Sequence, residues 1–88
     1  MWEKFSQSIE SSRIYHERYH KAVNHPIRRK ILTLVSQGKN MHEIAEELKI
    51  SFSELEFHLR VLEWGFCIER EGEKIKITKE GKVVEYLD

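Results

Sequence analysis

Hydrophobic residues recur along this chain with two different periods, and the period changes at Gly65. Before that glycine, apolar side chains return every three or four residues, which is the spacing of one helical face. After it, apolar and polar positions alternate, as they do in a half-buried strand. The pattern predicts helices at 2–23, 26–37, about 41–48 and about 52–64, strands at 67–70 and 74–78, and a last short helix at 79–87.

Capping residues agree with these helix boundaries. Pro26 suits the first turn of a helix because its missing N–H has no partner there, and Asn24 or His25 can cap that helix. Ser51 or Ser53 can cap the fourth helix. Further boundaries are expected at Gly38, Asn40, Gly65, the turn 71–73 and Thr78.

The order of the elements predicts the fold class. Leu55, Leu59 and Leu62 form the buried stripe of the fourth helix. Their expected core partners are Ile31, Leu34, Ile44 and Leu48. Two short helices joined by a tight turn and followed by a hairpin describe a helix-turn-helix with a wing. We therefore expect a mainly α protein with a small β-hairpin, a winged helix-turn-helix, as a single domain over residues 1–88.

Small size makes a homodimer attractive for this domain. A chain of 88 residues without a disulfide buries only about 60–65% of the surface of its unfolded state. Trp2, Phe5 and Ile9 share one helical face that the small fold has little interior to cover. The expected dimer interface comprises Trp2, Phe5, Ile9, Val83, Val84 and Leu87. The expected parts are a dimerisation helix at 1–23, a helix-turn-helix core at 24–66, a wing at 67–78 and a C-terminal helix at 79–88.

Composition and charge narrow the function classes. The chain has 15 basic and 15 acidic residues, and no apolar run approaches the length of a membrane span. Acidic and basic residues precede any apolar stretch at the N-terminus, so we expect a cytoplasmic protein rather than a secreted one. All acidic residues except Asp88 are glutamate, which together with many lysines is typical of thermophile surfaces. Plain helix preference explains the same bias.

Candidate catalytic and metal-binding groups are sparse. His16 and His20 are four residues apart, a spacing that can hold a divalent metal, but they lack a third ligand and are expected to be solvated. Cys67 is expected to be a buried structural cysteine, and His58 a partly buried, hydrogen-bonded histidine. No Ser/His/Asp set, glycine-rich phosphate loop or carboxylate pair is recognisable, so we expect no enzyme, no metal and no cofactor.

Four segments in order resemble winged helix-turn-helix repressors of the ArsR type. They are His25-Pro26-Ile27-Arg28-Arg29-Lys30-Ile31-Leu32, Ile44-Ala45-Glu46-Glu47-Leu48-Lys49-Ile50-Ser51, the set Leu55, His58, Leu59, Val61 and Leu62, and Ile77-Thr78-Lys79-Glu80-Gly81-Lys82. The resemblance covers about residues 22–87. It implies a dimeric transcription regulator that binds double-stranded DNA, with a structural role for Arg28.

The helix that should enter DNA departs from that family in charge. Residues 51–66 carry one arginine against three glutamates, whereas affinity for duplex comes mainly from neutralised phosphates. Glutamate can accept from the cytosine amino group, and phenylalanine can pack on a thymine methyl, so DNA binding remains compatible with this helix. The candidate DNA-contacting residues are Arg29, Lys30, Ser51, Ser53, Glu56, Arg60, Arg70 and Lys74, with Arg29 and Lys30 expected as exposed charges.

An alternative interpretation stays open at this point. Phe57, Val61 and Trp64 form a second apolar stripe on the fourth helix, at spacings of four and three. Such a stripe usually packs against protein, either the wing, the first helix or a partner. The alternative is therefore a winged-helix module that binds a protein partner and does not bind DNA through its acidic recognition helix.

Overall fold

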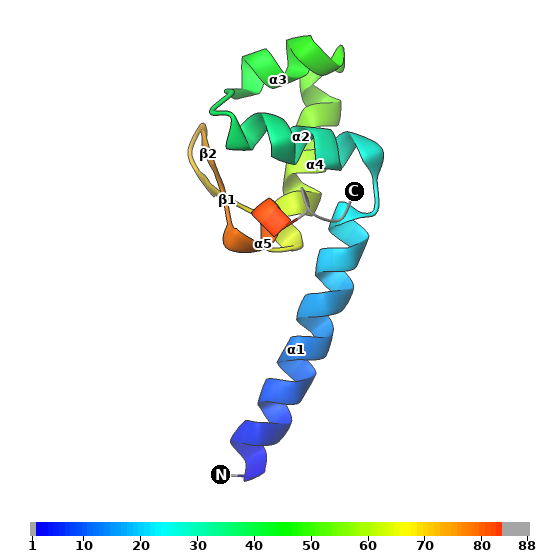
Figure 1. Ribbon diagram of the computed structural model, residues 1–88, viewed down its shortest axis with the longest axis vertical. Helices are drawn as coiled ribbons and strands as arrows, with labels where there is room; N and C mark the ends of the chain where they lie inside the picture. The colour runs from blue at the N-terminus through cyan, green and yellow to red at the C-terminus, as the bar shows by residue number, and fades with distance from the viewer. Residues whose placement is uncertain (1, 84–88) are drawn as a thin grey trace.

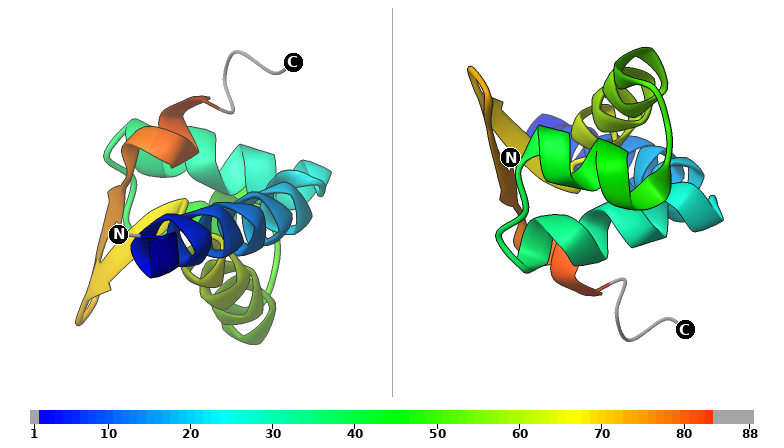
Figure 2. Two further views of the ribbon diagram at one scale, coloured as in Figure 1. Left: turned by 90° about the horizontal axis from the view of Figure 1, so that it is seen from below. Right: turned by 90° about the horizontal axis from the view of Figure 1, so that it is seen from above.

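The computed structural model describes the backbone of residues 2–83 and the side chains of residues 13–82. Its elements follow one another as α1 (Trp2–Val23), α2 (Pro26–Ser36), α3 (Met41–Leu48), α4 (Phe52–Trp64), β1 (Ile68–Glu71), β2 (Lys74–Ile77) and α5 (Lys79–Val83). The two strands form an antiparallel hairpin on one side of the helices (Figures 1 and 2). This confirms the expected class, a mainly helical winged helix-turn-helix.

The helices begin at side chains that accept from free backbone N–H groups. His25 caps α2, its Nδ1 accepting from the N–H of Ile27 at 3.2 Å. Ser51 caps α4, its hydroxyl oxygen accepting from the N–H of Glu54 at 3.1 Å. The sequence allowed Asn24 or His25 as the cap of α2 and Ser51 or Ser53 as the cap of α4. The structure shows that His25 and Ser51 are the caps. At α3 the cap is reciprocal, because Asn40 and Glu43 each bind the other's backbone N–H through their side chains.

The hairpin starts one residue later than expected. Phe66 has a left-handed backbone with φ of 67°, and the N–H of Cys67 donates to the carbonyl of Leu62 at 2.9 Å. This tight turn occupies Cys67, so the first strand begins at Ile68. The register pairs Ile68 with Ile77, Glu69 with Lys76, Arg70 with Ile75 and Glu71 with Lys74.

The core lies between the C-terminal end of α1, the helices α2, α3 and α4, and the start of β1. Its buried apolar residues are Ala22, Val23, Ile31, Leu32, Leu34, Val35, Ile44, Ala45, Leu55, Leu59, Leu62, Cys67 and Ile68. The leucine stripe of α4 is completely buried, as its spacing predicted. Leu48 was expected to share this core, but it is only partly buried and packs at the edge.

The N-terminal half of α1 projects beyond the other elements, whereas its C-terminal end packs against α4 (Figure 1). The close approach occurs at Gly65, where an added Cβ would overlap the Cβ of Ala22 and lie 3.0 Å from the carbonyl oxygen of Arg18. The Arg18 guanidinium lies 4.9 Å from the ring centre of Trp64 and 4.7 Å from that of Phe66. None of the helices described is both long and apolar enough to cross a membrane.

Two consecutive arginines of α2 bind the last carbonyls of α1. Arg28 donates from Nε to the carbonyl of Ala22 at 2.6 Å and from a terminal nitrogen to that of Lys21 at 3.1 Å. Its structural role is therefore confirmed. Arg29 donates from Nε to the carbonyl of Val23 at 2.8 Å and is half-buried. The prediction that Arg29 is an exposed charge was therefore wrong. The cause is the negative end of the α1 dipole, which attracts both guanidinium groups.

His58 is the buried polar residue of the described core, with 7% of its surface exposed. Its Nδ1 lies 3.3 Å from a terminal nitrogen of Arg28. Because arginine can only donate, this nitrogen accepts and the ring proton lies on Nε2. Burial lowers the pKa of His58 from its ordinary 6.5, and nearby His25 and Arg28 lower it further, against a smaller opposing effect of Glu54. The expectation of a partly buried, hydrogen-bonded histidine is confirmed.

The expected dimer residues fall outside the part of the chain that the structure describes in full. The side chains of Trp2, Phe5, Ile9 and Val83 lie beyond the described side chains, and Val84 and Leu87 lie beyond the described backbone. The interface therefore stays a prediction.

The stability of the core can be tested at Leu59. Its side chain is completely buried, so Leu59→Ala removes apolar contacts and leaves a cavity between the helices. We expect the free energy of unfolding to fall by about 2–5 kcal/mol, measured by urea denaturation. Phe57→Ala, at a position 60% exposed on the same helix, is the matched control and should change it by less than about 0.5 kcal/mol. Equal effects of the two substitutions would contradict this packing.

The lowered pKa of His58 predicts acid sensitivity. In the unfolded chain His58 has its ordinary pKa near 6.5. Below about pH 6.5 it is therefore protonated in the unfolded chain before it is protonated in the folded domain, which favours unfolding. The stabilisation is complete above that pH and is lost as the pH falls towards the lower pKa of the folded state. His58→Asn keeps an oxygen that can accept from Arg28 but does not titrate, so urea denaturation from about pH 7.5 to about pH 5 should show a flatter profile.

The exposed His20 supplies the control for that experiment. His20→Asn removes a histidine that the fold does not bury, so the steep loss of stability on acidification should persist. The assignment to His58 fails if both variants keep the wild-type profile.

Candidate nucleic-acid interface

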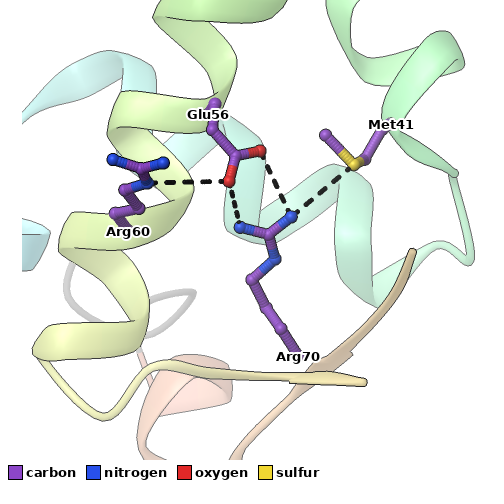
Figure 3. Close-up of polar contacts among 4 residues, drawn as sticks. All are labelled: Met41, Glu56, Arg60 and Arg70. Carbon is purple, nitrogen blue, oxygen red and sulfur yellow. Dashed lines mark hydrogen bonds and ion pairs between the residues drawn. The ribbon is translucent and has the colours of Figure 1, made fainter. Parts of the chain in front are cut away.

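Side chains from α4 and β1 meet at the carboxylate of Glu56, and Met41 of α3 contacts one of the arginines involved (Figure 3). Arg70 of β1 donates to both carboxylate oxygens, at 2.5 and 3.2 Å, and the same guanidinium lies 3.9 Å from the sulfur of Met41. Arg60, one helical turn after Glu56, places its Nε 3.7 Å from the carboxylate. We call Glu56, Arg60 and Arg70 the carboxylate cluster. It joins the recognition helix to the wing.

Strand alternation explains why Arg70 points toward the helices. Ile68 is buried at the start of β1, so the residue two positions later lies on the same face of the hairpin. Arg70 is accordingly half-buried, while Glu69 and Glu71 between and beyond them are exposed. The Arg70 guanidinium extends from the hairpin to α4, where it binds the half-buried side chain of Glu56.

The carboxylate cluster carries a net positive charge. The hydrogen bond from Arg70, assisted by the charges of Arg70 and Arg60, lowers the pKa of Glu56 against a smaller opposing effect of burial. The hydrogen bond to Glu56 in turn raises the pKa of Arg70. Glu56 is therefore ionised near neutral pH, so two arginines face one carboxylate.

The outer face of the wing is balanced in charge. Lys74 and Lys76 are exposed on β2, and the register places them opposite Glu71 and Glu69 of β1. Opposite charges at paired positions stabilise a hairpin modestly. The outer face of the wing therefore has no basic excess, whereas two arginines surround one carboxylate at the carboxylate cluster.

The outward face of α4 combines polar and aromatic residues. Ser53, Phe57, Arg60 and Trp64 follow one another at helical spacing and are all exposed. The exposed fractions of the aromatic residues on this helix are 48% for Phe52, 60% for Phe57 and 42% for Trp64. The expectation that Phe57 and Trp64 form one apolar stripe with Val61 needs refinement, because Trp64 lies under the guanidinium of Arg18 whereas Phe57 faces outward.

The structure distributes the eight expected DNA-contacting residues over three places. Ser53, Glu56 and Arg60 line one hollow on α4, and Arg70 joins them through Glu56, with Ser51 exposed at the start of the helix. Arg29 and Lys30 line a separate hollow on α2 with Pro26 and Thr33. Lys74 lies at the wing beside the turn between α2 and α3.

Sequence reasoning missed the pairing of Glu56 with Arg70. It named both residues as separate candidate DNA contacts and did not expect them to bind each other. The signal was available in the alternation of β1, which puts Arg70 on the face of Ile68. What was not available is the turn at Phe66, which sets the direction of the strand and hence the residue that Arg70 meets.

The remaining candidate groups lie away from this surface. Cys67 is fully buried, and burial raises the pKa of its thiol to about 12, as expected of a structural cysteine. His16 and His20 are exposed on α1 with ring centres 6.4 Å apart. Across the described residues, no group of three or more His, Cys, Asp or Glu is placed to hold a metal ion.

Comparison with known proteins agrees with the geometry. Residues 25–63 match the family described as bacterial regulatory protein, arsR family, and this segment runs from the cap of α2 nearly to the end of α4. An uncharacterized protein of Archaeoglobus fulgidus is 39% identical over 71 residues, which are 78% of this chain and 80% of that protein. This chain therefore belongs to the ArsR family of winged helix-turn-helix proteins and is a DNA-binding transcription regulator.

Proposed function

We propose that the protein acts as a cytoplasmic homodimer that places the N-terminal half of α4 in the major groove of duplex DNA, with the wing alongside. The observation that carries this proposal is the carboxylate cluster. Arg70 holds the wing against α4, and Arg60 adds a second cation beside the same carboxylate. The acidic recognition helix thereby gains a positive patch where its exposed face meets the wing.

The exposed members of the expected set suit contact with phosphates. The side chain of Arg60 is 76% exposed despite its contact with Glu56, so it can reach a phosphate. Lys30 and Lys74 are exposed on α2 and the wing. Arg29 is half-buried against the end of α1, so we assign it a positioning role beside Lys30.

Ser51, Ser53 and Glu56 are the proposed base-side residues. Ser51 already accepts from the N–H of Glu54, which leaves its hydroxyl hydrogen for a base or phosphate. Ser53 lies next to it in the first turn of α4 and is exposed. Glu56 keeps 33% of its side chain exposed while bound by Arg70, and a carboxylate edge can accept from a cytosine amino group.

The dimer is supported by the shape of the monomer. The N-terminal half of α1 projects beyond the remaining elements (Figure 1), and the sequence spacing puts Trp2, Phe5 and Ile9 on one side of that helix. Ile14, further along α1, is 52% exposed. Two copies would present two recognition helices to half-sites about one turn of DNA apart.

A second candidate function follows from the aromatic residues on α4. Phe52 and Phe57 expose about half or more of their surface, and aromatic anchors are enriched in protein interfaces. In this candidate the same face binds a protein, and DNA is not bound through α4. Duplex binding at low salt separates the two candidates, because phosphate contacts are strongest there.

Salt-titrated binding to random duplex DNA tests the proposal. We expect binding at about 50 mM salt and a large loss of affinity by about 200 mM. Arg60→Ala and Lys74→Ala should each weaken binding to all sequences and reduce the slope of log affinity against log salt by about 1. Glu54→Gln should strengthen non-specific binding because it removes an exposed negative charge from the first turns of α4.

Glu17→Gln is the matched control for that charge change. Glu17 is exposed on α1 and lines none of the hollows that hold expected DNA contacts, so its loss should affect binding less than that of Glu54. Failure of the wild-type protein to bind any duplex at about 50 mM salt would reject the DNA proposal and leave the protein-binding candidate.

Removal of residues 1–12 tests the dimer without disturbing the packed end of α1. Tyr15 and Arg18, which contact Phe66, remain in the shortened chain. We expect the full chain to sediment as a dimer and the shortened chain to dissociate with at least about a tenfold higher dissociation constant, because apolar side chains leave the interface. Equal masses at all concentrations would show that this segment does not form the interface.

A further inference from the structure

A hollow of about 470 Å³ lies along the N-terminal half of α4. Its lining residues are Met41, Phe52, Ser53, Glu56, Phe57 and Arg60. Apolar walls come from Met41 of α3 and the two phenylalanines of α4, and Glu56 and Arg60 are the charged lining residues. The hollow therefore combines an apolar surface with the positively charged carboxylate cluster.

The two phenylalanines are exposed and contribute little to the buried core. Phe57 is 60% exposed, and its ring approaches that of His58 edge-on, with ring centres 5.4 Å apart. Phe52 is 48% exposed and is held edge-on by His42 at 4.9 Å. Each ring thus contacts a neighbouring histidine on one side and leaves about half or more of its surface free for a ligand.

The major groove offers one apolar group for such a surface. Each base edge presents hydrogen-bond donors and acceptors there, and thymine adds the C5-methyl group. We propose that the hollow beside Phe52 and Phe57 recognises the C5-methyl group of thymine. This inference rests on the proposed function, because it assigns the feature of DNA that the same helix reads.

Charge complementarity favours DNA as the occupant. Arg60 and Arg70 stand at the edge of the hollow around a single carboxylate, so a polyanion is attracted to the same place where the apolar walls lie. Ser53, the other polar lining residue, can donate to or accept from any base edge and so adds little discrimination. Glu56 can favour cytosine at a neighbouring base pair. At the base next to Phe52 and Phe57 the preference depends on the methyl group, so we expect thymine there.

Four duplexes of equal length test the methyl contact directly. One pair alternates adenine with thymine or with uracil, and the other alternates guanine with cytosine or with 5-methylcytosine. In each pair only the methyl group differs. We expect the full-length protein to bind the methylated member more tightly by about three- to fivefold per contacted methyl, in both base contexts.

Substitutions of Phe57 assign the effect to the hollow. Phe57→Ala should bind the two members of each pair equally, whereas Phe57→Leu, which keeps an apolar side chain, should keep part of the preference. Ile14→Ala removes a side chain of similar exposure on α1 and should keep the whole preference, even if overall affinity changes.

The outcomes separate this inference from the proposal beneath it. Duplex binding without a methyl preference, or a preference that survives in Phe57→Ala, overturns the inference and leaves DNA binding intact. Equal binding together with loss of a protein contact in Phe57→Ala assigns the hollow to a protein partner. Absence of binding to all four duplexes overturns both the inference and the proposed function.

Discussion

The contact between α1 and the end of α4 decides where the wing lies. At Gly65 the backbone approaches Ala22 so closely that no side chain fits, and α4 ends at this point. Phe66 then adopts a left-handed backbone, which few residues other than glycine do. Its ring stacks on Tyr15 at 4.6 Å and lies under Arg18, so α1 holds the turn in place. The direction of β1 follows from that turn.

The direction of β1 in turn changes the electrostatics of the recognition helix. Counted along the sequence, α4 is an acidic helix and a poor partner for a polyanion. In the fold, Arg70 arrives from the wing and binds Glu56, while Arg60 approaches the same carboxylate from within the helix. A charge count by segment therefore overstates how negative this helix is in the fold, because a compensating cation belongs to another element.

The sequence predicted the helices closely because their signals are local. The apolar period and the caps at His25, Asn40 and Ser51 depend on residues a few positions apart. Prediction from the sequence failed at features that depend on contacts between residues far apart in the chain. Arg29 binds a carbonyl at the end of another helix, and the one-residue shift of β1 depends on the turn held by α1. The candidate site was half predicted for the same reason: its residues were named, but the pairing between α4 and β1 was not.

The buried Cys67 gives the molecule a built-in reporter of its own opening. It is the only cysteine of the chain, and it lies with no exposed surface between the end of α4 and the start of the wing. A thiol whose pKa is raised to about 12 is almost wholly protonated at neutral pH, so it is both inaccessible and a weak nucleophile. Alkylation of the native protein must therefore await a fluctuation that opens the packing around the junction of α4 and β1. The rate of that modification reports how often this junction opens, without any introduced label.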